Sequence, residues 1–243
     1  MASNTNLDQI LSQHNSITKP QTTNLIAGVF SWMFLALVIS AVTSYLFKTS
    51  GLISVIIDPI TFRPNPLGWI ITLLPLGLVL LMSFGYQKLS AFSLAVIFIL
   101  YSLLMGMSLS TIFLAYTGTS IASTFAITSL TFGIMALVGY TTKTDLTKLG
   151  SILMMALIGI IIATLINLFL HSGGLNLIIN IIGVIVFTGF TAYDVQNIKT
   201  LSQDAEVNGW DIRKTVIMGA LRLYLDFVNL FLFLLNFFGR RNN

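Results

Sequence analysis

The sequence predicts an all-α integral membrane protein, built as a bundle of seven transmembrane helices. The chain has 243 residues, of which 56% are hydrophobic and 8% are charged, and its mean hydropathy is +0.92. Soluble domains carry roughly 25% charged residues. Seven stretches also reach the roughly 20 apolar residues that cross about 30 Å of hydrocarbon. These observations place residues 25–243 in one membrane domain.

Residues 1–24 form a polar segment before the first span. They are rich in Asn, Gln, Ser and Thr. They lack the basic start and the apolar stretch of a cleavable signal peptide. We therefore expect a cytoplasmic tail without regular structure, a prediction that rests on composition.

Polar or small residues separate the seven expected spans, whose cores lie at 25–47, 67–85, 91–116, 120–141, 149–170, 175–195 and 216–238. The first connection, from Lys48 to Pro66, is proline-containing and long enough for an ordered external loop. Pro75 lies inside the second span, where it removes one backbone hydrogen bond and is expected to kink the helix. Short connections near Gly118 and Gly173 predict tight helical hairpins.

Small residues recur along the third and fourth spans, and we interpret them as sites where helices pack closely in lipid. They are Gly106, Ser108, Ser110, Gly133, Ala136 and Gly139. Between the fourth and fifth spans, T-T-K-T-D-L predicts a short cytoplasmic loop with Asp145 capping the next helix.

The distribution of cations predicts a cytoplasmic N-terminus and an external C-terminus, because positive residues gather on the cytoplasmic side. In this orientation seven cations face the cytoplasm: Lys19, Lys88, Lys143, Lys148, Lys199, Arg213 and Lys214. Four face outside: Lys48, Arg63, Arg240 and Arg241. We therefore interpret the basic balance of the chain, a formal net charge of +4, as orienting it in a lipid bilayer. We expect no nucleic-acid partner.

Several kinds of chemistry lack the residues they need. The chain has no cysteine, which excludes disulfides, thiolate catalysis and zinc-thiolate sites. His14 lies in the polar tail and His171 at an outer helix end, and no metal-ligand spacing is present. We expect no cofactor and no enzymatic activity.

Two aspartates lie in the last two apolar stretches, Asp194 in T-A-Y-D-V-Q and Asp226 in L-R-L-Y-L-D-F. An ionisable side chain at membrane depth costs roughly 2.5–3.5 kcal/mol on insertion scales, so it is usually retained where it pairs, titrates or lines a polar path. Asp194 is near the expected cytoplasmic end of its span, where solvation at the interface is the alternative explanation. Asp226 is expected about 10–16 Å below the surface, for a helix that starts between residues 216 and 219.

Two carboxylates that meet in apolar surroundings do not both stay ionised, so this pair would sense protons. When ionised, the same oxygens suit a hard cation such as Ca²⁺, but they are too few to bind it tightly, which fits transient occupancy. Three further side chains could add polar contacts: Tyr193, Tyr224 and Asn229. Arg222 shares a helical face with Asp226 at four-residue spacing, so an ion pair within the helix is the simpler explanation for both charges.

Several motifs resemble the Bax inhibitor family, also called transmembrane Bax inhibitor motif proteins. The segment T-G-F-T-A-Y-D-V-Q-N-I-K at 188–199 is similar to the family signature. The segments M-G-M-S-L-S at 105–110, G-Y-T-T-K-T-D-L at 139–146 and A-L-R-L-Y-L-D-F-V-N-L-F at 220–231 resemble its bacterial branch. The resemblance implies a seven-helix bundle with the last helix central, located in the bacterial inner membrane.

The resemblance also implies a pH-sensitive calcium leak, in which Asp194 and Asp226 match the paired aspartates of the family. Described members carry an arginine in the second helix that latches onto the first of these aspartates. This chain has no arginine there. Lys88, just past the second span, and Arg222 are the candidates for the charge partner.

Two other functions agree with parts of the sequence. Bacterial members of the family are also described as regulators that bind a membrane-bound AAA protease, which makes a non-transporting regulator the main alternative. An intramembrane aspartyl protease likewise needs a Tyr-Asp and a second aspartate on neighbouring helices. This chain has L-Y-L-D around Asp226 in place of G-x-G-D, and no P-A-L sequence follows, so the protease is the weaker alternative.

Overall fold

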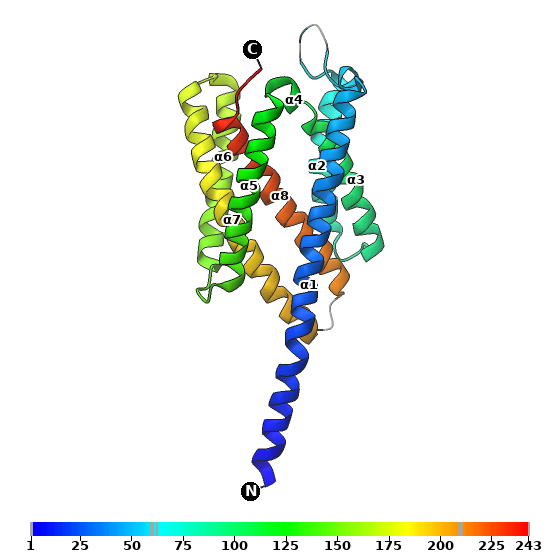
Figure 1. Ribbon diagram of the computed structural model, residues 1–243, viewed down its shortest axis with the longest axis vertical. Helices are drawn as coiled ribbons and strands as arrows, with labels where there is room; N and C mark the ends of the chain where they lie inside the picture. The colour runs from blue at the N-terminus through cyan, green and yellow to red at the C-terminus, as the bar shows by residue number, and fades with distance from the viewer. Residues whose placement is uncertain (1, 59–60, 62, 209–210, 243) are drawn as a thin grey trace.

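The computed structural model describes residues 2–58, 61, 63–208 and 211–242, and the described chain is helical with no sheet. The all-α prediction is confirmed. The elements, labelled in Figure 1, are α1 (Ala2–Thr49), the short 3-10 helix η1 (Leu52–Val55), α2 (Pro66–Gly85), α3 (Ala91–Leu109), α4 (Ile112–Ala115), α5 (Gly118–Thr141), α6 (Thr147–Leu170), α7 (Gly173–Asn208) and α8 (Ile212–Phe238).

Seven helices in the described chain are long and apolar enough to cross a membrane, as predicted. The third span is divided, because α3 ends at Leu109 and the short α4 completes the crossing. The last two helices are longer than expected: α7 continues to Asn208 and α8 begins at Ile212. Polar residues mark where the membrane ends, but they do not end a helix when no proline or glycine interrupts it.

The expectation that residues 1–24 lack regular structure is wrong. From Ala2 onward the chain is helical, and this helix, α1, continues without a break into the span that begins at Leu25. This part of α1 projects beyond the bundle at the N-terminal end of the molecule (Figure 1). Extending an existing helix is far less costly than starting one, so a polar segment can follow the helix formed by its neighbour.

The last helix is the centre of the bundle. In its most apolar window, 67% of α8 is buried by the rest of the protein, compared with 11% of α6. α8 packs against α1 and α3 on one side and against α5 and α7 on the other. Figure 1 shows it running obliquely between these two groups. The central position that the family resemblance implies is therefore observed.

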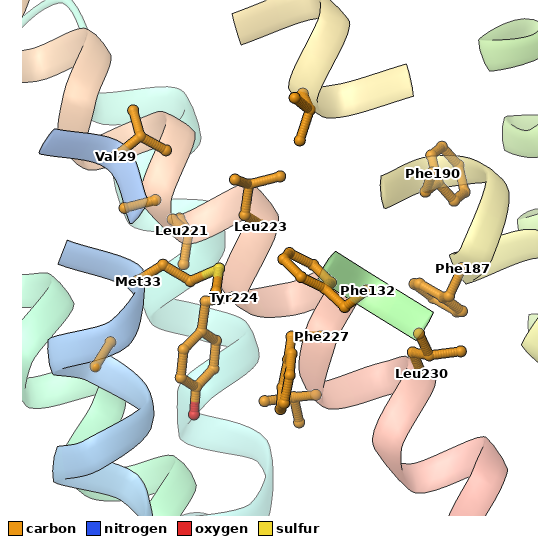
Figure 2. Close-up of a cluster of buried hydrophobic side chains, with 14 of the residues drawn as sticks. Val29, Met33, Phe132, Phe187, Phe190, Leu221, Leu223, Tyr224, Phe227 and Leu230 are labelled. Carbon is orange, nitrogen blue, oxygen red and sulfur yellow. The ribbon is translucent and has the colours of Figure 1, made fainter. Parts of the chain in front are cut away.

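The hydrophobic core lies around α8, because its buried side chains pack against those of the neighbouring helices. Phe227 of α8 packs against Phe132 of α5, with ring centroids 5.5 Å apart. Tyr224 of α8 lies toward Met33 of α1, as Figure 2 shows. A second group of rings, including Phe187 of α7, belongs to the same cluster. Burial against protein is thus concentrated on α8, while the outer helices present apolar side chains outward.

Helix ends are defined by local hydrogen bonds. The side chain of Asn65 accepts from the N–H of Gly68 and Pro66 opens α2, while Ser90 and Thr117 cap α3 and α5 in the same way. The predicted hairpins are present, since α5 begins at Gly118 and α7 at Gly173. Pro75 lies inside α2 without ending it.

The connection between α1 and α2 is ordered where it is described, as predicted. It contains η1, an isolated antiparallel bridge between Ile57 and Pro64, and a hydrogen bond from Asn65 Nδ2 to the carbonyl of Val55. The two chain ends lie at opposite ends of the molecule in Figure 1, as an odd number of crossings requires.

The small-residue prediction is confirmed at two of its glycines. A Cβ on Gly106 would meet the carbonyl oxygen of Ser40 at 2.6 Å, and one on Gly139 would collide with the carbonyl oxygen of Ala192. Only glycine allows these backbones to approach so closely. Gly133 is different, because a Cβ there would meet nothing within 4 Å.

Candidate functional site

Asp194 lies inside α7, where its side chain is 8% exposed. Its helix is held close to two others by small residues: Ala192 packs on Gly139 of α5, and the ring of Tyr193 packs on Gly150 of α6. Because α7 continues well past this residue to Asn208, Asp194 does not sit at a helix end. Only 8% of its side chain is exposed, so protein rather than solvent surrounds this carboxylate. Its position relative to the membrane interface stays a prediction.

Asp226 lies in the buried part of α8 and is 5% exposed. Since α8 begins at Ile212, the residue is about 21 Å along the helix axis from its start, at 1.5 Å per residue. The helix starts earlier than the sequence suggested, and the depth of about 10–16 Å below the membrane surface stays a prediction. A carboxylate this far from the helix end must find its partners within the protein.

The two aspartates lie close to each other across the α7–α8 interface, near enough for each carboxyl group to act on the other. Two fully ionised carboxylates have no donor, so a hydrogen bond between them requires a proton on one. One oxygen of Asp226, Oδ2, is buried and has no hydrogen-bond partner among the residues that the structure describes. The pair is therefore a protonatable site that is incompletely satisfied in this state.

Arg222 acts electrostatically on both aspartates, but it forms no ion pair with either of them within the described structure. The intrahelical ion pair with Asp226, expected from four-residue spacing, is therefore not formed. The two side chains leave α8 in different surroundings: Asp226 is buried, whereas Arg222 is not covered by protein. Spacing alone sets Cβ proximity, while the packing of neighbouring helices decides which way each side chain extends.

The other side chains that we expected near Asp194 and Asp226 make their contacts elsewhere. Lys88 is exposed just beyond α2 and contacts neither carboxylate. The side-chain amide of Asn229 donates to the carbonyl of Leu225 one turn earlier. Tyr193 packs on α6, and Tyr224 points to α1, so neither supplies the polar contact that we expected.

Sequence reasoning missed a buried hydroxyl network on the other side of α8. Ser40 of α1 donates to the carbonyl oxygen of Ser102 of α3, at 2.7 Å. The Tyr224 hydroxyl lies 2.7 Å from the same Ser40 oxygen, and it must be the donor because the Ser40 proton is already used. No local pattern reveals this network, because serines and tyrosines are common packing residues in membrane helices.

A second missed group ties the α5–α6 connection to α7, just after Asp194. The side chain of Gln196 donates to the carbonyl of Thr144 and accepts from the N–H of Leu146. The ammonium of Lys199 donates to the carbonyl of Tyr140 at the end of α5. Movement of the α7 segment after Asp194 is therefore coupled to this connection.

Asp145 has the capping role that was predicted for it. Its Oδ1 accepts from both the hydroxyl and the N–H of Thr147, the first residue of α6. These two hydrogen bonds hold the pKa of the Asp145 carboxyl below its ordinary value of 3.8. This exposed carboxylate is thus structural and ionised at neutral pH.

The described residues contain no group of three or more His, Asp or Glu side chains that could hold a metal ion. The aspartate pair could offer oxygens to a hard cation. The remaining ligands of a Ca²⁺ ion would have to come from water or backbone carbonyls.

The chain is similar to several bacterial proteins over nearly its whole length. A family model described as "Inhibitor of apoptosis-promoting Bax1" matches residues 22–243. An uncharacterized protein of Borreliella burgdorferi is 46% identical, over 90% of this chain and 92% of the relative. The inner membrane protein YbhL of Escherichia coli is 44% identical, over 93% of this chain and 97% of the relative. An uncharacterized protein of Rickettsia prowazekii is 42% identical, over 88% and 89%.

Proposed function

Since this multi-pass membrane protein belongs to the Bax inhibitor family, we propose that it is a pH-sensitive calcium leak of the bacterial inner membrane. Asp194 and Asp226 are its proton sensor and part of the ion pathway, and Arg222 is the charge partner in preference to Lys88. The proposed orientation has the N-terminus in the cytoplasm. Calcium is the permeant ion rather than a resident cofactor.

The observation that carries this proposal is the proximity of two buried carboxyl groups on the two helices that pack at the centre of the bundle. With one shared proton the contact joins α7 to α8. When both groups ionise, repulsion in a low-dielectric interior separates them. A change in proton occupancy thus becomes a change in how two central helices pack.

The same oxygens can interact with a passing cation. Two carboxylates attract Ca²⁺ strongly but provide only part of the six to eight oxygens it takes, so the ion is held weakly enough to leave. The unpartnered Oδ2 of Asp226 is one oxygen available for this contact.

Calcium flux into liposomes tests the proposal directly. Purified protein is reconstituted in liposomes that contain a calcium-sensitive dye, and flux is recorded across a range of pH. We expect a pH-dependent leak that disappears or loses its pH dependence in the double variant Asp194→Asn, Asp226→Asn. No flux above protein-free liposomes at any pH would rule the proposal out.

A non-transporting regulator is the second candidate, with a membrane-bound AAA protease as its partner. The helical projection of α1 beyond the bundle favours it, because this segment extends away from the membrane domain, where a partner can reach it (Figure 1). Deleting residues 2–24 discriminates between the functions. A leak channel should retain its flux, whereas a regulator should lose its effect on the turnover of membrane proteins by the protease.

A further inference from the structure

A cleft of about 690 Å³ lies between the end of α2, the later part of α7 and the first half of α8. Apolar side chains form most of its wall, among them Val79 of α2, Leu201 of α7 and Met218 of α8. The cleft exists because α2 packs mainly on α3, whereas α8 packs on α1, α3, α5 and α7. Neither Asp194 nor Asp226 lines it.

Two cations of α8 face this cleft. Lys214, Met218 and Arg222 follow each other at four-residue spacing, so they share one face of the helix. Helical side chains lean toward the N-terminus of their helix. Both cations therefore line the same cleft, with Lys214 about two helical turns before Arg222.

The Arg222 guanidinium acts electrostatically on Asp194 and Asp226, but it is in direct contact with no carboxylate that the structure describes. It forms no hydrogen bond and no ion pair with any residue that the structure describes. Its Cα lies about 15 Å along α8 from Ile212, at 1.5 Å per residue, within the candidate membrane span Ile212–Phe238. A charged side chain at such depth is expected to have a counterion or to reach the interface.

Lys214 can contribute a second set of donors. Its ammonium lies 3.5 Å from the carbonyl oxygen of Tyr86, at the C-terminal end of α2, and above the Tyr86 ring. An ammonium has three donors, so two remain for another acceptor. Among the described residues that line the cleft, the carboxylate is Asp211, which accepts from the N–H of Arg213 at the start of α8.

From this juxtaposition we propose that the cleft binds an anionic phospholipid of the surrounding membrane. Its phosphate lies against Lys214 and Arg222, and its acyl chains lie along Val79, Met218 and Leu225. Charge complementarity selects an anionic headgroup, and the apolar wall selects a lipid over a soluble anion. The inference is independent of whether the protein conducts calcium.

Native mass spectrometry of the purified full chain in detergent tests this site. The probes are phosphatidylglycerol, phosphatidylcholine with the same acyl chains, and inorganic phosphate. We expect the protein to retain phosphatidylglycerol in preference to phosphatidylcholine. Arg222→Gln and Lys214→Gln should each weaken phosphatidylglycerol binding about fivefold, the value for roughly 1 kcal/mol per cation near a membrane surface.

Two variants make the result specific to the cleft. Lys143→Gln removes an exposed cation from the α5–α6 connection, outside the cleft, and should leave binding unchanged. Ser83→Trp fills the cleft from α2 without altering any charge, and it should abolish retention of phosphatidylglycerol even if Arg222→Gln fails to fold.

Two outcomes would overturn the proposal. One is equal retention of the two lipids by the wild-type protein, or unchanged phosphatidylglycerol binding in Ser83→Trp. The other is inorganic phosphate that binds as strongly as phosphatidylglycerol and with the same dependence on Arg222, because the cleft would then be a site for free anions.

Discussion

At the scale of single residues, the two buried aspartates have different surroundings. Asp226 lies in the central helix and has one oxygen without a hydrogen-bond partner, whereas Asp194 lies on a helix with lower burial. Asp194 also lies close to Gln196, which ties α7 to the α5–α6 connection. The two carboxyl groups act on each other, but they do not occupy equivalent positions.

We predict that Asp226→Asn changes the pH dependence of calcium flux more than Asp194→Asn. The physical reason is depth, because desolvation acts more strongly on the residue in the central helix. The measurement is flux into dye-loaded liposomes across pH. Equal effects, or a larger effect at Asp194, would mean that the connection tied to α7 controls the sensor.

Asp145→Asn is the matched control for these variants, since it removes an exposed carboxylate at the same end of α7. The folded pKa of Asp145 lies below its ordinary value. Such a group stabilises the fold above the unfolded pKa and loses this contribution only as pH falls through the lower, folded value. Its ionisation is therefore constant across the neutral range, and the pH profile of flux should keep its midpoint.

A second prediction concerns Arg222, whose charge acts on both aspartates without contacting either. Arg222→Gln should lower expression and the melting temperature in detergent, because a buried acceptor without a compensating charge costs about 1–3 kcal/mol. Adding Asp226→Asn should restore both. The same rescue by Asp194→Asn, with calcium leakage at neutral pH in the single variant, would instead identify Arg222 as a latch on Asp194. Rescue by neither would reject both roles.

At the scale of helices, close backbone contact at glycine positions fixes how the spans pack. The Gly139 position of α5 lies against the backbone of Ala192, two residues before Asp194. Any displacement of α5 at this position therefore moves a neighbour of the aspartate pair. We therefore expect a change of the small residue at this position to affect the aspartate pair as well as the packing of the helices.

We predict that Gly139→Ala destabilises the protein by about 1–3 kcal/mol, because overpacking forces two helices apart. Gly133→Ala in the same helix is the control, since its new Cβ meets nothing within 4 Å. It should be neutral or stabilising by about 0.5–1 kcal/mol, the gain in helix propensity. Thermal unfolding in detergent measures both, and equal losses would show that α5 and α7 do not depend on this contact.

At the scale of the whole molecule, the described residues contain seven candidate membrane spans, and the two chain ends lie at opposite ends of the molecule. The α1–α2 connection lies at one end of the bundle and the α5–α6 connection at the other (Figure 1). Because the chain contains no cysteine, a single introduced thiol reports its own position without background.

We predict that Ser54→Cys in η1 is labelled in intact cells by a membrane-impermeant maleimide, whereas Lys143→Cys is labelled only after the cells are opened. Both positions are exposed, so access to the reagent decides the result. The expectation follows from the excess of cations on the side of Lys143. The opposite pattern would reverse the proposed orientation.

Local properties of the sequence were sufficient for the spans, the hairpins and the capping residue Asp145. Hydropathy identifies a helix that crosses a membrane because each backbone group must be satisfied within its own segment. The motif around Asp194 likewise identified the family from consecutive residues. The polar segment before Leu25 was misjudged because composition does not show that a neighbouring helix continues through it.

Only the tertiary structure decided which polar groups meet. In lipid both faces of a helix are apolar, so periodicity carries little information about helix rotation. The structure sets that rotation: it brings Asp194 to Asp226, joins Tyr224 to Ser40, and turns Arg222 toward the cleft beside α2. The sequence by itself determined a seven-helix membrane protein with two intramembrane carboxylates. The packing around the central helix determined that they form a pair, because contacts between distant segments depend on the whole bundle.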